Sequence, residues 1–470
     1  MTESWSSSSW DVHLDWRPES GRQGLADAFR RAIRDGRLPP GTAVPSTRAL
    51  AADLGIARGT VTRVYADLAD EGYLRTAQGA PTRVAAGSAT PPSTRDKSGP
   101  RAAPWVPDVR WDLYPGRPDL SSFPRTAWVS ATRRVLAEAP ASSFDYGDDR
   151  GPAVLREALA RYLARSRGVV ADPERILVCG GFSHALTALS RVLLDRGHRE
   201  LAFEDPSLPQ FRTVAARSGL PVAGVPVDDH GLRVSEIDSP AVVVTPAHQY
   251  PMGHTLAPER RTALAHWASA GGLVIEDDYD GEFRLDRQPV GCVQALAPER
   301  VIYVGTVSKT LAPSLRIGWL VLPGALVEPT RAAIAATGWR TPVLPHLILA
   351  ELISSGAYDR HVRQRRAAYR KRRDRLLAAL PDGFTPAGIS AGLHVVLRLP
   401  PGRTEAECVA NALRHSVAVD SLSRHWVSEH EDHPQGIVVG YASPAEHAFG
   451  PALDALVRSL AVAGHDVGVG

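Results

Sequence analysis

Lysine is scarce in this chain of 470 residues. Only Lys97, Lys309 and Lys371 stand among its 54 basic residues, and all the others are arginine. Chemistry that depends on an amine nucleophile is therefore limited to three side chains.

Other absences exclude further classes of protein. The three cysteines, Cys179, Cys292 and Cys408, are odd in number and lack CxxC spacing, so neither a disulfide framework nor a metal site is indicated. No run of about 18 apolar residues is present, which argues against a membrane span. The first fifteen residues lack the basic and then apolar pattern of a signal peptide. We expect a soluble, reduced, cytoplasmic protein with no membrane partner.

The length predicts more than one domain, and the formal charge of +3 excludes neither nucleic acid nor small ligands. Residues 85–104, AAGSATPPSTRDKSGPRAAP, have the composition of a linker. We expect an N-terminal tail over residues 1–19, a small domain over 20–87, a linker over 88–104 and a large domain over 105–470.

The small domain reads as three helices and a hairpin. Leu25, Phe29 and Ile33 recur at helical spacing, and Ser46 is placed to cap a short second helix. A third helix is predicted from Arg58 to Glu71, followed by two short strands around Gln78-Gly79. Helices joined by a tight turn and followed by a hairpin describe a winged helix-turn-helix.

Charge supports a DNA-binding face on this domain. Residues 20–87 carry ten arginines and six acids, a surplus of +4. Arg48, Arg58 and Arg63 lie near the starts of the second and third helices, where they can reach phosphates or base edges. The alternative is a small protein-interaction domain with solvated arginines.

The segment from RAIRDGRLPPG to GAPTRV resembles the DNA-binding domain of the GntR family of bacterial transcription regulators. The resemblance implies a double-stranded operator as partner. The residues expected at the DNA are Ser46, Arg48, Arg58, Gly59, Thr60, Arg63 and Gly79. Ala57 departs from the family, which often has a Ser or Thr helix cap there.

The large domain alternates apolar runs with helical stretches. Buried strands are predicted in RILVCGG, ELAFED, AVVVTPA, GLVIEDD and RVIYVGT. This alternation favours an α/β fold with a mostly parallel sheet, in which ligands bind beyond the carboxyl ends of the strands.

The three lysines differ in their surroundings. Lys97 lies in the linker. Lys371 lies in residues 361–374, which hold seven bases and one acid and read as a solvated helix face, or else as an extra DNA or subunit contact. Lys309 follows a buried strand among small and apolar neighbours, where burial would depress its pKa as imine-forming lysines require. A structural lysine paired with a carboxylate is the alternative.

Candidate partners for a cofactor surround Lys309 in the sequence. Asp277 and Tyr279 follow a predicted strand, so that a carboxylate could hold a pyridinium nitrogen and a hydroxyl could meet a phenolic oxygen. A phosphate could be held where a strand gives way to a helix and by hydroxyl and guanidinium groups near Lys309; these residues are Gly181, Phe182, Ser183, Thr306, Ser308 and Arg316.

These motifs resemble the fold-type I, pyridoxal-phosphate-dependent aminotransferases over about 360 residues. The resemblance implies that Lys309 forms the internal aldimine with pyridoxal 5'-phosphate, and that the other residues named above hold the ring and the phosphate. It also implies a C-terminal α+β subdomain and a homodimer in which Tyr146 reaches the phosphate of a neighbouring subunit. A GntR-type winged helix fused to this domain is similar to the MocR subfamily, including its PdxR-like members.

Three departures from the aminotransferases concern the ligand. Leu208 stands where an aromatic residue usually stacks on the ring, and Tyr250 stands where catalytic members have Asn. Val438 replaces an arginine that clamps the substrate carboxylate in many relatives.

We therefore expect a DNA-binding transcription regulator that binds pyridoxal phosphate and responds to that cofactor or to a small amine or amino acid. Two alternatives stay open. One is a working aminotransferase that also binds DNA. The other is a regulator that has lost the cofactor and uses the large domain only to dimerise.

Overall fold

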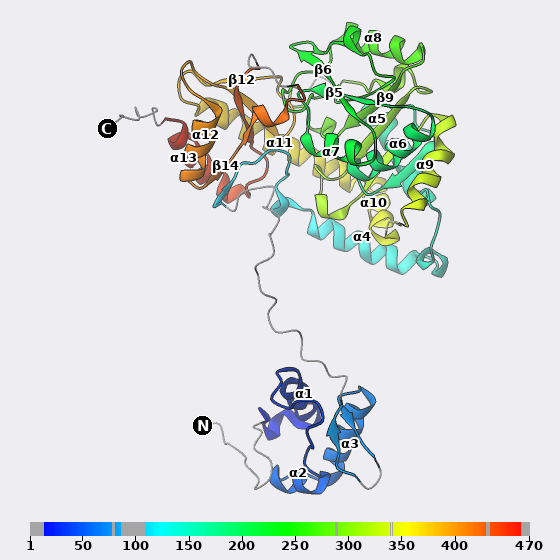
Figure 1. Cartoon of the computed structure of the whole chain (residues 1–470), viewed down its shortest axis with the longest axis vertical. Coiled ribbons are helices and arrows are strands. Elements are labelled where there is room, and N and C mark those ends of the chain that lie inside the picture. Colours follow the sequence, from blue (N-terminus) through cyan, green and yellow to red (C-terminus); the bar gives the residue numbers. More distant parts are fainter. Residues whose placement is uncertain are drawn as a thin grey trace. The chain divides into compact units, whose positions relative to one another are not determined.

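The chain divides into two compact units, residues 1–103 and 104–470 (Figure 1). A computed structural model describes residues 14–77, 80–85, 109–286, 290–338, 340, 342–428 and 433–461. Within these ranges, no helix is both long enough and apolar enough to cross a membrane.

The smaller unit consists of helices and one hairpin, as predicted. Its elements are η1 (Pro18–Ser20), α1 (Gly21–Arg34), α2 (Thr47–Asp53), α3 (Arg58–Asp70), β1 (Leu74–Arg75) and β2 (Arg83–Val84). The hydroxyl of Ser46 caps α2 by accepting a hydrogen bond from the Ala49 N–H at 3.1 Å. Ala57 precedes α3 without any side-chain cap. Apolar stripes of α1 and α3 meet in the core, where the rings of Phe29 and Tyr65 contact edge to face.

The larger unit is built on an eight-stranded sheet. In spatial order its strands are β4 (Ile176–Cys179), β11 (Gly318–Val321), β10 (Val301–Thr306), β9 (Leu273–Asp278), β8 (Ala241–Val244), β5 (Leu201–Asp205), β6 (Val222–Asp228) and β7 (Gly231–Leu232). All five predicted strands are present. The pairs from β10 to β6 are parallel, whereas β11 is antiparallel to both neighbours. The prediction of a mostly parallel α/β sheet is confirmed.

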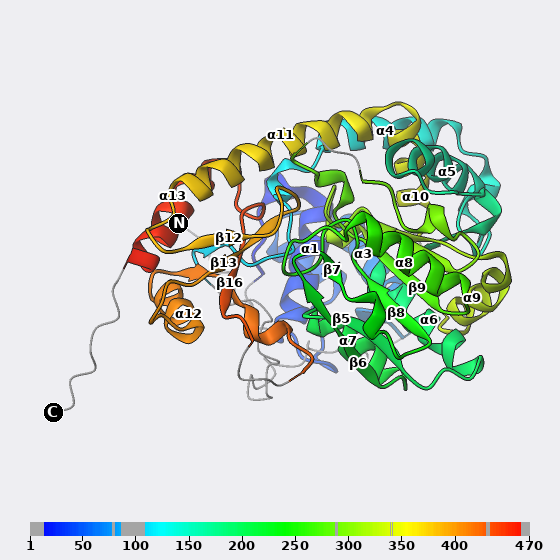
Figure 2. The same ribbon diagram turned by 90° about the horizontal axis from the view of Figure 1, so that it is seen from above.

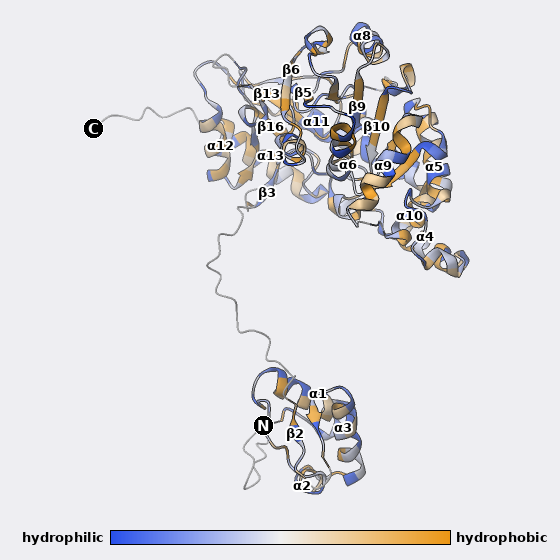
Figure 3. Cartoon of the chain, turned by 45° about the vertical axis from the view of Figure 1, so that its right-hand side comes forward, coloured by the Kyte–Doolittle hydropathy of each residue, from blue (hydrophilic) through white to orange (hydrophobic). Residues whose placement is uncertain are grey.

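Helices cover both faces of this sheet. They are α4 (Arg125–Glu138), α5 (Ala153–Arg167), α6 (Phe182–Asp195), α7 (Pro209–Arg217), α8 (Pro258–Ser269), α9 (Gly324–Ala336) and α10 (Val343–Ser354). Successive strand residues face opposite layers: Val178 packs with α5 and α10, and its neighbours Leu177 and Cys179 pack with α6. The central strands are accordingly apolar (Figure 3).

A C-terminal α+β subdomain completes the larger unit. Its elements are α11 (Ala357–Ala378), β12 (Thr385–Ala387), β13 (His394–Arg398), α12 (Glu405–Arg414), β14 (Val417–Ala418), β15 (Asp420–Ser421), β16 (Gly436–Gly440) and α13 (Glu446–Ala461). Four of the strands form an antiparallel sheet in the order β12-β13-β16-β15. The short strand β3 (Trp111–Asp112) pairs with β14, so the start of the larger unit is tied to its end. Figure 2 shows α11 along the outer edge of this unit.

Candidate functional site

Lys309 lies just beyond the carboxyl end of β10. Its Nζ donates a hydrogen bond to the carbonyl oxygen of Gly116 at 2.5 Å. Burial lowers the pKa of Lys309, and the nearby carboxylates of Asp277 and Asp280 oppose that shift. A larger share of this amine is therefore neutral, and thus nucleophilic, than in an exposed lysine.

Asp277 is a buried carboxylate near this amine. It is the second-last residue of the strand β9 and is 4% exposed. It has no hydrogen-bond partner among the described residues. Burial raises its pKa well above the usual range, and the charge of Lys309 opposes the rise. Burial of a carboxyl group is costly unless a hydrogen-bond donor reaches it. A protonated ring nitrogen would supply that donor.

Tyr279 is two residues further on, and its hydroxyl is held by His248. The hydroxyl lies 3.0 Å from His248 Nδ1, and the same nitrogen lies 2.9 Å from Asp280 Oδ2. The imidazole therefore links the phenol to a buried carboxylate. The sequence contains His248 within TPAHQYPMG, but no spacing rule connects it with Tyr279, which is 31 positions away.

The start of α6 offers free N–H groups. Gly181 is the N-cap residue, with φ 93° and no capping side chain. The N–H groups of Phe182 and Ser183 lie in the first turn, where a helix has no acceptor for them. A Cβ at Gly181 would lie 4.0 Å from Thr306 Oγ1, so this helix end adjoins the strand end that precedes Lys309.

Hydroxyl groups and a guanidinium lie beside this helix end. Together with the free N–H groups they form what we term the phosphate cup. Thr306 Oγ1 lies 2.8 Å from Ser308 Oγ and accepts from the Ser308 N–H at 3.1 Å. Arg316 has φ 53°. Burial lowers the pKa of His184 in the first turn of α6, and the charge of Arg316 lowers it further. An anion would meet the helix N-terminus, two hydroxyls and one cation here. The residues brought together thus suit pyridoxal phosphate: an amine, a carboxyl for the ring nitrogen, a phenol, and a phosphate cup.

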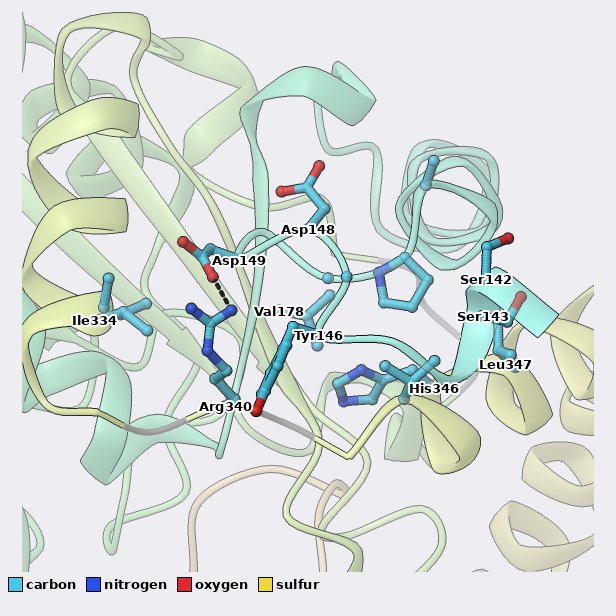
Figure 4. Close-up of a pocket in the computed structure, with 16 residues that line it drawn as sticks. Ser142, Ser143, Tyr146, Asp148, Asp149, Val178, Ile334, Arg340, His346 and Leu347 are labelled. Carbon is cyan, nitrogen blue, oxygen red and sulfur yellow. Dashed lines mark hydrogen bonds and ion pairs between the residues drawn. The ribbon is translucent and has the colours of Figure 1, made fainter. Parts of the chain in front are cut away.

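Tyr146 is not brought to this cup within the chain. Its side chain is 82% exposed and lies over the guanidinium of Arg340, which pairs with Asp149 at 2.6 Å (Figure 4). Together with Ser142, Asp148 and His346, these residues line a cavity of about 230 Å³. Burial lowers the pKa of His346 to about 4, and neither ring nitrogen has a hydrogen-bond partner among the described residues.

The three departures from the aminotransferase pattern have different surroundings. Leu208 precedes α7 and is partly buried; in the next turn the ring of Phe211 lies 4.5 Å from that of Phe182. Tyr250 is buried, with its ring 4.9 Å from His394 and 5.3 Å from His425. Val438 is fully buried in an apolar cluster of Met252, Ala387, Val396 and Leu422, which leaves no room for a guanidinium.

The C-terminal subdomain is bonded directly to a strand end of the large sheet. Asp205, the last residue of β5, accepts hydrogen bonds from the Val427 N–H at 2.7 Å and the Ser428 N–H at 3.1 Å. Its second oxygen also accepts from the Ser428 hydroxyl at 2.5 Å. The loop that carries Leu208 begins at the next residue.

The smaller unit presents unpaired arginines at the predicted DNA face. Arg48, Arg58 and Arg63 are exposed and form no ion pair with any described carboxylate. Arg58 Nε lies 3.4 Å from Thr47 Oγ1, which links the starts of α2 and α3. Gly59 and Thr60 lie in the first turn of α3, and Gly79 lies outside the described residues.

Two family matches divide the chain as the structure does. Residues 22–84 match the bacterial regulatory proteins of the gntR family, and residues 116–425 match aminotransferase class I and II. Among solved structures, an archaeal alanine:glyoxylate aminotransferase superposes with a TM-score of 0.67 at 26% identity, covering 74% of this chain and 90% of its own.

Relatives along nearly the whole chain are regulators. The HTH-type pyridoxine biosynthesis transcriptional regulator PdxR of Corynebacterium glutamicum is 34% identical, over 91% of this chain and 93% of its own. The HTH-type transcriptional regulator TauR of Rhodobacter capsulatus is 33% identical, over 93% and 96%. The probable rhizopine catabolism regulatory protein MocR of Rhizobium meliloti is 31% identical, over 89% of each.

Proposed function

Because the chain belongs to the aminotransferase class I and II family and, with its gntR-family domain, is a transcriptional regulator of the MocR and PdxR type, we propose that it binds pyridoxal 5'-phosphate at Lys309 and that occupancy of this site sets how it binds DNA. The observation that carries the proposal is Asp277, a buried carboxyl group that has no hydrogen-bond partner among the described residues and interacts with the charge of Lys309.

Each residue of the site has a role toward the cofactor. When bound, pyridoxal phosphate supplies an aldehyde and an electron-withdrawing ring. Lys309 would present an amine whose pKa is lowered by burial, Asp277 would accept from the ring nitrogen, and Tyr279 would meet the ring oxygen while His248 orients its hydroxyl. The start of α6 would hold the phosphate through the N–H groups of Gly181, Phe182 and Ser183, together with Thr306, Ser308 and Arg316.

The effector is pyridoxal phosphate itself, or a small amine or amino acid that reacts at the bound cofactor. The naming of one relative for pyridoxine biosynthesis supports the first of these. Val438 lies in an apolar cluster, so the carboxylate of an amino acid lacks its usual guanidinium partner at that position. The same lack of a guanidinium favours regulation over metabolic transamination. A regulator of this kind would act in the cytoplasm, where the DNA is.

The functional unit is a homodimer. Large apolar side chains stand exposed on α4 and just after it, among them Val129, Leu136 and Phe144, beside the exposed ring of Tyr146. Apolar surface of this kind is typical of an interface. In a dimer, Tyr146 reaches the phosphate of the neighbouring subunit.

Loading with cofactor is expected to change DNA affinity. Coupling between two sites typically corresponds to about a 5- to 150-fold change in affinity. A duplex selected from a random pool by the loaded protein serves as the probe, and its dissociation constant is measured with and without pyridoxal phosphate. The variant Lys309→Ala is expected to show no response to the cofactor. Equal affinities for wild-type protein in both states would reject the coupling.

Replacement of Asp277 by Asn is expected to act in opposite directions on the two states. The cofactor-free protein should melt at a higher temperature, because an unpaired buried carboxyl is replaced by a neutral amide. The affinity for pyridoxal phosphate should fall by about ten-fold or more, since the charged acceptor of the ring nitrogen is lost. Asp454→Asn, an exposed change of the same type on α13, is the control. Unchanged cofactor affinity in the Asp277 variant would contradict its assigned role.

A further inference from the structure

Helix α11 is the longest described helix, and it presents a basic face to solvent. Its buried side packs Tyr358, Val362, Tyr369 and Leu376 into the unit. Its outward side, which we term the basic face, consists of the exposed Arg360, Arg363, Lys371 and Arg375 and the half-buried Arg370. With 22 residues the helix spans about 33 Å, close to one turn of duplex DNA. Figure 2 shows it along the outer edge of the larger unit.

These five cations are not neutralised by neighbouring acids. None of them forms an ion pair with a described carboxylate, and only Asp374 interrupts the face, which leaves five bases against one acid. Their polar contacts are few: Arg360 donates to the Ser355 carbonyl at 3.3 Å, and Arg375 lies over the Phe449 ring. Elsewhere on the same unit, Arg150, Arg260 and Arg331 are paired with carboxylates at 3.2 Å or less. Exposed arginines without an ion pair to a described carboxylate also occur singly there, at Arg199, Arg217 and Arg300, so the basic face is distinguished by the clustering of such cations along one helix.

The same signature marks the predicted DNA face of the smaller unit. There, Arg48, Arg58 and Arg63 are exposed and form no ion pair with a described carboxylate, whereas Arg30 on α1 is held by Asp27 and Glu71. A row of like charges without counterions repels itself, and a polyanion relieves that repulsion while releasing condensed salt ions.

We propose that the basic face of α11 binds the phosphate backbone of duplex DNA, as a second and sequence-independent contact beyond that of the winged helix. Duplex DNA is the occupant because its charge is complementary and the same chain carries a DNA-binding domain. This contact adds affinity to any site that the winged helix recognises.

The test is the salt dependence of DNA binding by the full-length protein. The probe is a labelled random-sequence duplex of about 40 base pairs, titrated between about 50 and 200 mM salt. The triple variant Arg363→Gln, Arg370→Gln, Lys371→Gln is expected to bind more weakly. The slope of log K against log salt should become shallower by about 2 to 3, since each lost phosphate contact contributes about 0.9.

Two matched variants separate a local effect from net charge. The triple control Arg199→Gln, Arg217→Gln, Arg300→Gln removes the same charge at exposed positions away from α11. Arg217 ends α7, and the other two lie shortly before β5 and β10. This control should keep the wild-type slope. Arg363→Lys with Arg370→Lys keeps the charge and should also keep the slope. Gln has a helix propensity close to that of Arg and Lys, so the substitutions should preserve α11. If the triple variant is nevertheless unstable, the single variant Lys371→Gln tests the same proposal. It is expected to reduce the slope by about 0.9.

A wild-type slope in both the triple variant and Lys371→Gln would overturn the proposal, as would an equal loss in the Arg199 control. A wild-type slope together with an altered oligomeric state in sedimentation would assign the face to a contact between copies, and would also overturn it. Because the titration uses protein without cofactor, its failure leaves the proposed role of Lys309 untouched.

Discussion

Replacement of Lys309 by alanine is expected to abolish covalent attachment of pyridoxal phosphate and the visible absorbance that accompanies it. The reason is that the sequence offers only two other lysines. Lys97 lies outside the described residues, and Lys371 lies on the exposed face of α11 with no buried carboxylate beside it. Of the two lysines in the described part of the chain, Lys309 is the one that combines a burial-lowered pKa with the neighbours Asp277 and Asp280.

The measurement is an absorbance titration followed by borohydride reduction and peptide mass analysis. Wild-type protein should carry one reduced adduct, on Lys309, and Lys371→Ala should retain it. A wild-type protein that stays colourless and takes up no added cofactor would support the reading in which the large domain only dimerises. Repeated spectral cycling with an amino acid and a keto acid would instead favour a working aminotransferase.

The second large effect is expected in the smaller unit, where Arg58→Ala should weaken binding to a selected operator by about ten-fold or more. Loss of an arginine that reads a base edge typically costs about 1 to 3 kcal/mol. Arg58 stands at the first position of α3, is exposed, and contacts Thr47 at the start of α2, so one side chain serves both helices at the DNA.

Arg22→Ala provides the control for this change. Arg22 lies at the start of α1 and its nearest carboxylate, Asp67, is 3.9 Å away, so it carries the same charge in a different setting. Cofactor absorbance should be unchanged in both variants. If Arg58→Ala bound the operator as tightly as wild type at the same salt concentration, α3 would not be the recognition helix.

Local patterns in the sequence were sufficient for most of the fold. The predicted apolar runs are short and flanked by polar residues, and each is a strand of the sheet. These strands end at Cys179, Asp205, Val244, Asp278 and Thr306. The cap at Ser46 and the missing cap at Ala57 were likewise predictable, because a cap depends on residues three positions apart.

The site was less predictable where it depends on pairings across the chain. His248 contacts Tyr279 and Asp280 from a different strand end, and Lys309 donates to Gly116, 193 positions earlier. The spacing of residues along the sequence does not predict such contacts, since they follow from the order of the strands in the sheet. The basic run at residues 361–374 was also ambiguous, because sequence alone could not separate buried members such as Arg372 and Arg373 from exposed ones.

Asp205 connects the C-terminal subdomain mechanically to the loop that carries Leu208. Its carboxylate grips the backbone at Val427 and Ser428, and the peptide that follows it leads through Ser207 to Leu208 beside the predicted ring position. A movement of the C-terminal subdomain would therefore act on the loop of Leu208 through these bonds. α11 joins the same two bodies along another path, because Tyr358 and Val362 pack in the core of the large sheet while Tyr369 and Leu376 pack in the core of the C-terminal subdomain.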